Sequence, residues 1–257
     1  MRKLLRLMAV ISAALCATGT ALAGPVITFD ALDPSYGSLA PSFPFIGSGD
    51  FMVEGAYAIG VVSTKAGAQA GDLVGAVLDG SDPFMCFGVV CPGNNPTQYL
   101  AALNDGLPYI FRLDNGLFHV TQFDASFIAA EGVAVLPTAL LLRVQGFNGA
   151  TLAGQQDFLL PGPTSGDYDF STYMFSDAFA GTAFSEIDFI GYACTTPSNC
   201  TRALNQAQFG LDNITFADPT VVPEPSSLAL VGLALIGAGS ARRRISLQAR
   251  AVRKLQD

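Results

Sequence analysis

The sequence predicts an all-β fold, a two-sheet antiparallel β-sandwich of the jelly-roll kind, between two end segments that do not belong to it. Short stretches rich in Val, Ile, Phe and Tyr recur between clusters of Gly, Pro, Asn and Asp, which is the pattern of strands and turns. No long amphipathic helical pattern competes with them, and no repeat of fixed period occurs. Residues 24–219 are therefore expected to form one β-sandwich domain.

The first end segment, residues 1–23, has the three parts of a secretory signal peptide. A basic start at residues 2–6 precedes an apolar stretch at residues 7–17, and the small residues Ala21 and Ala23 form a cleavage site. We expect signal peptidase to cut after Ala23 and the rest of the chain to be exported.

The domain contains nine expected strands, because each segment is rich in β-branched or aromatic residues and is bounded by turn-forming ones. They are Val26–Asp30, Phe51–Val62, Leu73–Leu78, Tyr109–Leu113, Ser126–Ala130, Leu140–Phe147, Asp169–Phe175, Glu186–Tyr192 and Phe209–Phe216. One stretch is expected to be helical instead, Thr97–Asn104, in which Tyr99, Leu100 and Leu103 share one side at helical spacing.

The first and last expected strands alternate apolar and polar residues most clearly, at residues 27–30 and 208–216. Since the first and last strands of a jelly roll commonly lie together, we expect these two to pair.

Four cysteines remain once Cys16 is removed with the signal peptide: Cys86, Cys91, Cys194 and Cys200. An even number in an exported chain indicates disulfides, with three connectivities. We expect the local pairs, Cys86 with Cys91 and Cys194 with Cys200, each closing a turn. The alternative is a four-cysteine metal site, although the spacings are loose for zinc.

The C-terminal segment, residues 220–257, begins with Pro223, Glu224 and Pro225 and continues with an apolar run at residues 226–241. As a helix this run would be about 24 Å long, marginally enough to span a hydrocarbon core of about 30 Å. The basic cluster that follows would stay on the cytoplasmic side. That cluster consists of Arg242, Arg243 and Arg244.

This order of motif, short transmembrane helix and arginine stop resembles the PEP-CTERM sorting tail that exosortase-type enzymes recognise in Gram-negative bacteria. The resemblance implies that an exosortase removes the tail, so the protein is membrane-bound only transiently and then reaches the cell surface or the extracellular polysaccharide matrix. The alternative is an ordinary single-span anchor.

The strands that open and close the domain also resemble those of the carbohydrate-binding-module-like domains common in PEP-CTERM proteins. These domains open with a Phe-Asp strand and close with a Leu-Asp-Asn-Ile strand, as here at residues 29–30 and 211–214. Residues 208–212 further resemble the Gln-Phe-x-x-Asp signature of one PEP-CTERM subfamily.

The stretch between the two removable ends is strongly acidic. Residues 24–222 contain four of the 13 basic residues and 19 of the 21 acidic ones, so their net charge is 4 − 19 = −15. Such a surface repels phosphate backbones, which argues against nucleic acid as a partner. It suits divalent cations, cationic surfaces or neutral sugars.

A calcium site is the most chemical prediction for the domain. Pairing of the first and last strands would bring Asp30, Asp212 and Asn213 together, and these side chains offer the hard oxygen ligands that calcium prefers. The alternative is that both aspartates serve only as strand-end residues.

No catalytic machinery is evident, and we expect a protein that is not an enzyme. The sequence has one histidine, His119, and no Gly-x-Ser-x-Gly elbow. A glycoside hydrolase with two carboxylates remains an alternative, because Glu186 and Asp188 would share one strand face.

We expect a structural or glycan-contacting role, with exopolysaccharide as the partner and a calcium-dependent carbohydrate-binding module as the alternative. The chain has no tryptophan to stack on sugar rings. The aromatic residues expected on loops are Tyr99, Tyr168, Tyr173 and Phe87.

Overall fold

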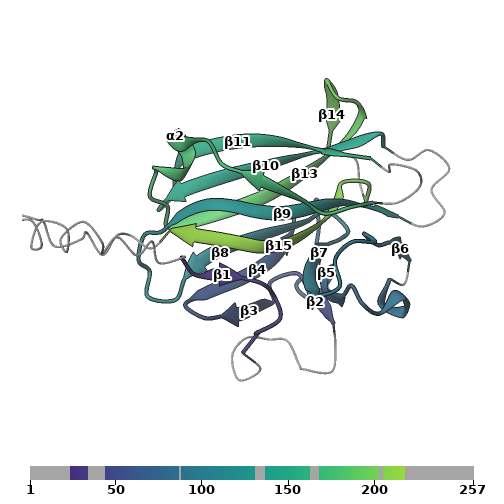
Figure 1. The fold of residues 1–257 in the computed structure, drawn as a ribbon, viewed down its shortest axis with the longest axis horizontal. Coiled ribbons are helices and arrows are strands. Elements are labelled where there is room, and N and C mark those ends of the chain that lie inside the picture. Colours follow the sequence, from purple (N-terminus) through teal and green to yellow (C-terminus); the bar gives the residue numbers. More distant parts are fainter. Residues whose placement is uncertain are drawn as a thin grey trace, which may run out of the picture. The chain divides into compact units, whose positions relative to one another are not determined.

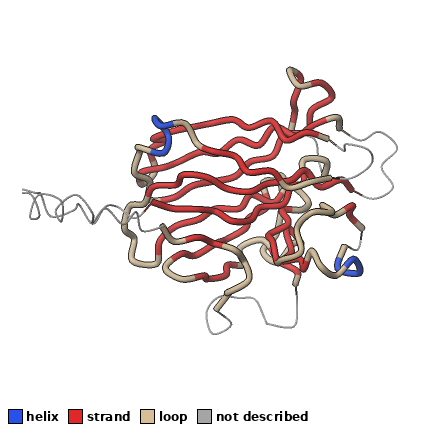
Figure 2. Tube along the Cα trace, viewed as in Figure 1, coloured by secondary structure: helices blue, strands red, loops and turns tan. Residues whose placement is uncertain are grey.

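In the computed structural model, the described part of the chain comprises residues 24–33, 44–86, 88–130, 137–162, 168–202 and 205–217. Strands make up most of it, as Figure 2 shows. They are β1 (Val26–Ile27), β2 (Phe45–Gly47), β3 (Phe51–Glu54), β4 (Tyr57–Ser63), β5 (Leu73–Asp79), β6 (Val89–Val90), β7 (Gln98–Ala102), β8 (Gly106–Arg112), β9 (His119–Ala130), β10 (Ala139–Asn148), β11 (Thr151–Pro161), β12 (Ser171–Met174), β13 (Glu186–Thr196), β14 (Asn199–Thr201) and β15 (Gln208–Ala217). Helix is confined to the short turns η1 (Pro83–Met85) and α2 (Asp177–Ala180) within these residues.

The strands form two antiparallel sheets, which confirms the predicted two-sheet sandwich (Figure 1). The eight-stranded sheet has the order β12-β9-β15-β7-β5-β2, with β1 also paired to β15 and β6 to β9. The seven-stranded sheet has the order β11-β10-β13-β8-β4-β3, with β14 also paired to β13.

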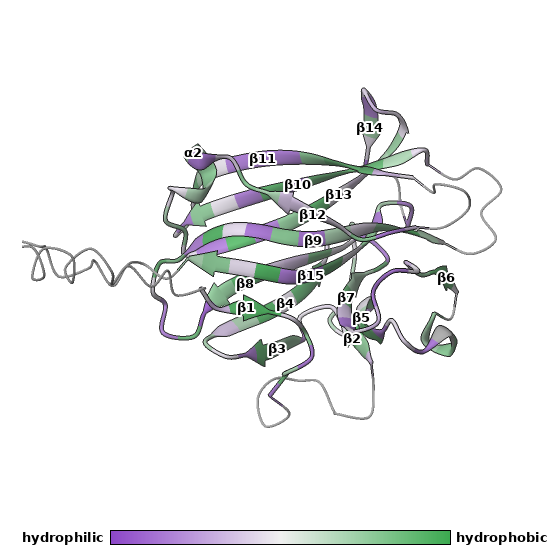
Figure 3. Cartoon of the chain, in the orientation of Figure 1, coloured by the Kyte–Doolittle hydropathy of each residue, from purple (hydrophilic) through white to green (hydrophobic). Residues whose placement is uncertain are grey.

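The main apolar core contains inward side chains of both sheets. Leu100, Phe127 and Phe209 come from the eight-stranded sheet, and Leu142 and Phe189 from the seven-stranded sheet. Hydrophobic and hydrophilic residues alternate along β9 (Figure 3), as expected of a strand with one face in a core. Since burial of a Leu or Phe side chain is worth about 1.5–3 kcal/mol, this layer holds the two sheets together.

The pairing of the first and last strands is confirmed. β1 lies antiparallel to β15, with Val26 opposite Thr215 and Ile27 opposite Ile214. β1 is shorter than predicted because Phe29 turns the chain with a φ of 60°. The buried carboxylate of Glu54 holds this turn by accepting hydrogen bonds from the backbone nitrogens of Thr28 and Phe29, at 3.0 and 2.8 Å.

The predicted helix at Thr97–Asn104 is wrong, because these residues contain strand β7. Leu100 and Ala102 of β7 face the main core, whereas Tyr99 and Ala101 belong to a second apolar cluster on the opposite face. A strand that is buried on both faces lacks the apolar–polar alternation by which strands are recognised.

Other strand boundaries also differ from the prediction. The segment Phe51–Val62 is a hairpin of β3 and β4 rather than one strand, and it turns at Gly55, whose φ is +60°. β11 was not predicted, although it pairs with β10 from Ala139 opposite Pro161 to Asn148 opposite Thr151. The short strands β2, β6 and β14 also went unpredicted.

The outer face of the eight-stranded sheet, which points away from the main core, carries the second apolar cluster. We call it the covered face, because parts of the segment between β5 and β7 pack on it. The cluster consists of Ala76, Leu78, Tyr99, Ala101, Leu103 and Ile128, with Met85, Val89, Cys91 and Phe170 packed against it.

Candidate functional site

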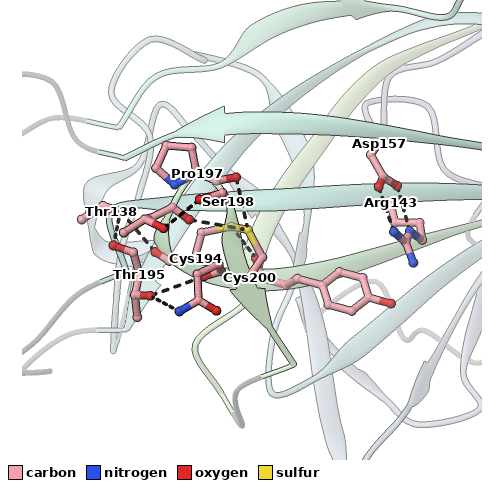
Figure 4. The surroundings of a disulfide bond; sticks show 11 residues. Thr138, Arg143, Asp157, Cys194, Thr195, Pro197, Ser198 and Cys200 are labelled. Atoms are coloured by element: carbon pink, nitrogen blue, oxygen red, sulfur yellow. Dashed lines mark hydrogen bonds and ion pairs between the residues drawn. A yellow bond between two sulfur atoms is a disulfide. The ribbon is translucent and has the colours of Figure 1, made fainter.

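Both predicted disulfides are present in the structure. Cys86 is bonded to Cys91, and Cys194 is bonded to Cys200. Figure 4 shows the second bond, which joins residues directly opposite one another in the β13–β14 hairpin. The hydroxyl of Thr138 donates to the carbonyl oxygen of Cys194 at 3.2 Å and so ties this hairpin to the start of β10. Both bonds therefore support loops of the fold and leave no cysteine thiolate for chemistry among these four residues.

The predicted calcium residues lie at the end of the covered face. Asp212 on β15 is only 1% exposed. Its Oδ2 accepts a hydrogen bond from the side-chain amide of Asn95 at 2.7 Å, and its Oδ1 accepts one from the backbone nitrogen of Asn213 at 2.7 Å. Asn213 in turn donates from Nδ2 to Asp124 at 2.9 Å.

Asp30 lies in the same region but has a separate partner. Its Oδ1 accepts a hydrogen bond from the backbone nitrogen of Gln98 at 2.9 Å. Burial raises the pKa of Asp212 to about 6 against the hydrogen bonds from Asn95 and Asn213, and the charges of Asp30 and Asp124 raise this pKa further.

Asp30 and Asp124 thus lie close enough to Asp212 for their charges to affect it. Each of the three aspartates also accepts a hydrogen bond from the protein. In the described ranges, no group of three or more His, Cys, Asp or Glu side chains is arranged to hold a metal ion. The calcium site stays a prediction. What the contacts do show is that Asp212 fastens the segment before β7 to the covered face through Asn95.

The outer face of the seven-stranded sheet has a different character. Core side chains such as Val144, Ile187 and Ile110 alternate along β10, β13 and β8 with residues that point the other way. We call this the carboxylate face. Its central residues are Gln145 and Phe147 on β10, Glu186 and Asp188 on β13, and Tyr109 and Phe111 on β8.

The strand register sets these six side chains side by side. Asp188 lies between Gln145 and Tyr109 on the neighbouring strands, and Glu186 lies between Phe147 and Phe111. Neighbouring strands are about 4.8 Å apart, and alternate residues of one strand are separated by about 7 Å. A small ligand could therefore contact both carboxylates and both flanking strands.

Two aromatic rings on β8 form a platform beside the carboxylates. The rings of Tyr109 and Phe111 are nearly parallel, with an interplanar angle of 7° and centroids 6.1 Å apart. Tyr109 lies over Gly60 on β4, where any side chain would collide with the tyrosine ring. Glycine at this position therefore lets the ring lie down on the sheet.

Arg143, a cationic residue on this face, already has an ion-pair partner. Arg143 on β10 makes a two-pronged ion pair with Asp157 on β11, through Nε–Oδ1 and Nη2–Oδ2 contacts of 2.8 Å each. Its guanidinium carbon also lies 5.3 Å from the centre of the Tyr192 ring. The hydrogen bonds from Arg143 lower the pKa of Asp157, as expected of a paired carboxylate.

Glu186 and Asp188 have no such partner among the described residues. The Oδ1 atom of Asp188 is buried and receives no hydrogen bond from them. Burial raises the pKa of Asp188 to about 7, and the charge of Glu186 adds to the rise; burial also raises the pKa of Glu186. This pair can accept hydrogen bonds or a cation from a ligand.

The aromatic residues predicted to stack on sugars are not the ones the structure offers. Tyr99 and Tyr168 are buried, so their prediction as exposed platforms is wrong. Tyr173 stacks on the core residue Phe123, and Phe87 lies outside the described residues. The platform of Tyr109 and Phe111 was missed, although their two-residue spacing on a predicted strand was a usable signal.

The remaining predicted residues fall into two groups. The ring Nδ1 of His119 lies 3.0 Å from the carbonyl oxygen of Ala180, a contact that joins β9 to α2. The predicted cleavage and sorting residues lie outside the described residues; they are Ala21, Ala23, Pro223, Glu224, Pro225, Arg242, Arg243 and Arg244. A membrane-spanning helix does not occur in the described part of the chain.

Comparison with known proteins gives a family match and likenesses to solved structures. No curated protein matches the chain. A crystal structure of a DUF4465 family protein from Bacteroides caccae is similar to 75% of this chain and 98% of its own, with 11% sequence identity and a TM-score of 0.44.

The family match concerns the C-terminal segment. Residues 221–244 match the PEP-CTERM protein-sorting motif, which includes the Pro-Glu-Pro sequence and the arginine cluster. The motif implies processing by an exosortase, and together with the two disulfides it indicates an exported protein that is sorted to the surface. The chain is thus a β-sandwich protein that carries a PEP-CTERM sorting motif at residues 221–244.

Proposed function

We propose that this protein is not an enzyme and that its sandwich contacts glycan at the cell surface or in the extracellular polysaccharide matrix of a Gram-negative bacterium. The sorting motif supports the location, because it implies exosortase processing. The carboxylate face supports the contact with glycan. It is the one observation on which the ligand class depends.

Sugars present an apolar ring face and an edge of hydroxyl donors, so their sites combine aromatic platforms with fixed polar groups. The carboxylate face has both, since the parallel rings of Tyr109 and Phe111 lie beside Asp188 and Glu186, which have no ion-pair partner among the described residues. Gln145 adds an amide on the other side of Asp188.

The test is a glycan array with the purified exported protein, with and without calcium. Binding should fall at least tenfold in Tyr109→Ala, because the platform is lost. The matched control is Phe84→Ala, which removes an aromatic ring that is 90% exposed on η1, between two strands of the other sheet. No binding to any glycan, or equal binding by the Tyr109→Ala protein, would refute the proposal.

The location has its own test. Mass spectrometry of the surface protein from a host with an active exosortase should find a chain that lacks residues 1–23 and ends near Pro223–Pro225. A surface protein that retains residues 228–236 would contradict exosortase processing.

A calcium-dependent carbohydrate-binding module is the second candidate. It is supported by the proximity of Asp30 and Asp124 to Asp212, whose pKa is raised by burial and further by the charges of these two neighbours. In that case glycan binding on the array should disappear when calcium is chelated.

A further inference from the structure

We propose that the carboxylate face recognises a polysaccharide with free amino groups, a partly deacetylated amino-sugar polymer, and that Glu186 and Asp188 pair with its ammonium groups. This inference rests on the proposed function and names its ligand class.

The charge at the centre of the carboxylate face favours a cationic ligand. Arg143 on this face is neutralised by the two-pronged contact with Asp157. Glu186 and Asp188 have no ion-pair partner in the described residues, so the centre of the face is negative. A uronic-acid polymer would be repelled here, while a cationic chain would be attracted.

The repulsion between Glu186 and Asp188 also favours a cation. The charge of Glu186 adds to the rise that burial causes in the pKa of Asp188. An ammonium group beside the two carboxylates would relieve this repulsion, whereas a neutral hydroxyl group would not.

The aromatic platform distinguishes a glycan from other cations. The Tyr109 and Phe111 rings lie on the strand next to both carboxylates, with Tyr109 opposite Asp188 and Phe111 opposite Glu186. A sugar ring stacked on this platform would carry its amino group toward the acidic pair. A polyamine has no ring face to stack on the platform, so it would gain only a cation–π contact from it.

The experiment compares three oligosaccharides of equal length by titration calorimetry: N-acetylglucosamine oligomers, their deacetylated form and an oligouronate. The exported protein should bind the deacetylated form at least tenfold more tightly than the acetylated form, and it should not bind the uronate. Spermine is included as a cation without a sugar ring. Measurements are made at a pH where the amines are protonated; because a neighbouring ammonium group lowers the pKa of a carboxyl, Asp188 is expected to be ionised in the complex.

Two variants locate the effect. The double variant Glu186→Gln, Asp188→Asn should bind both glucosamine oligomers equally, because the side chains keep their shape and lose their charge. The matched control Asp169→Asn removes an exposed carboxylate before β12 and should keep the preference.

The outcomes separate the two proposals. Equal binding of the acetylated and deacetylated oligomers by the unmodified protein would overturn the amino-sugar inference and leave the glycan-contacting function standing. Binding of spermine as tight as that of the deacetylated oligomer would also overturn the inference. No binding of any of the three oligosaccharides would also overturn the inference, whereas the proposed function is refuted only if the glycan array is empty as well.

Discussion

The outer faces of the two sheets carry buried or half-buried carboxylates, but these carboxylates have different partners. On the covered face, Asp212 accepts hydrogen bonds from Asn95 and Asn213. On the carboxylate face, Asp188 keeps an oxygen without any donor from the described residues. The comparison shows that burial of a carboxylate alone does not mark a binding site. Both oxygens of Asp212 accept hydrogen bonds from the protein, so this carboxylate stabilises the fold. The following predictions test whether the two faces differ in this way.

The largest effect is expected for Asp212→Ala. The substitution leaves the side-chain amide of Asn95, which is 8% exposed, without its acceptor, so the free energy of unfolding should fall by about 2–3 kcal/mol. Urea unfolding measures it. Asp169→Ala is the control, an exposed carboxylate whose removal should change stability by less than about 0.5 kcal/mol. A similar small change in Asp212→Ala would mean that the covered face does not need its buried acid.

Removal of either disulfide should lower stability by a similar amount, but the two variants should loosen different parts of the fold. Each closes a loop of five or six residues, so loss of either should cost about 2 kcal/mol. Cys86→Ser should loosen the segment over the covered face, and hydrogen exchange should then increase in β7. Cys194→Ser should loosen only the β13–β14 hairpin. Exchange that rises in the same strands for both variants would contradict this division.

On the carboxylate face, Asp188→Asn should stabilise the protein at alkaline pH. A carboxyl whose pKa is raised in the folded state contributes stability at low pH and loses it as the pH rises through that value, here about 7. The gain at about pH 8 should be on the order of 1–2 kcal/mol, and near pH 4 the two proteins should be equally stable.

The titratable groups next to Asp188 must stay the same for this comparison. They are Glu186 on its own strand and Tyr109 opposite it on β8. Urea unfolding across the pH range is the measurement. A stability gain that does not depend on pH would mean that ionisation of Asp188 is not its cause.

The smallest effect is expected for calcium. Because Asp212 and Asp30 already accept hydrogen bonds from the protein, calcium, magnesium and sodium at equal ionic strength should raise the melting temperature equally by screening. Calcium bound at a specific site would instead raise the free energy of unfolding by about 2.7 kcal/mol at one hundred times the dissociation constant. If this increase occurs with calcium alone and is lost in Asp212→Ala, it would support the calcium-dependent module.

The sequence allowed prediction of the sandwich, the β1–β15 pairing and both disulfides, because each depends on a local pattern. The covered face could not be predicted. Tyr99 was predicted to lie in a helix and to be an exposed aromatic residue, since a strand buried on both faces shows no alternation. The carboxylate face was only half visible: the shared face of Glu186 and Asp188 follows from strand periodicity, but the neighbouring position of Tyr109 depends on sheet order.

The pairing of β1 with β15 also bears on mechanical strength. The backbone nitrogen of Phe216 donates to the carbonyl oxygen of Pro25 at 2.9 Å, so the sandwich begins and ends at one place. Any pull from the C-terminal segment enters the domain through β15, which is hydrogen-bonded to β9, β7 and β1. An edge strand can be peeled away one hydrogen bond at a time, whereas β15 would have to shear against its neighbours at once. A domain that is held by its C-terminal segment during sorting is thereby loaded along a strand that is hydrogen-bonded on both sides.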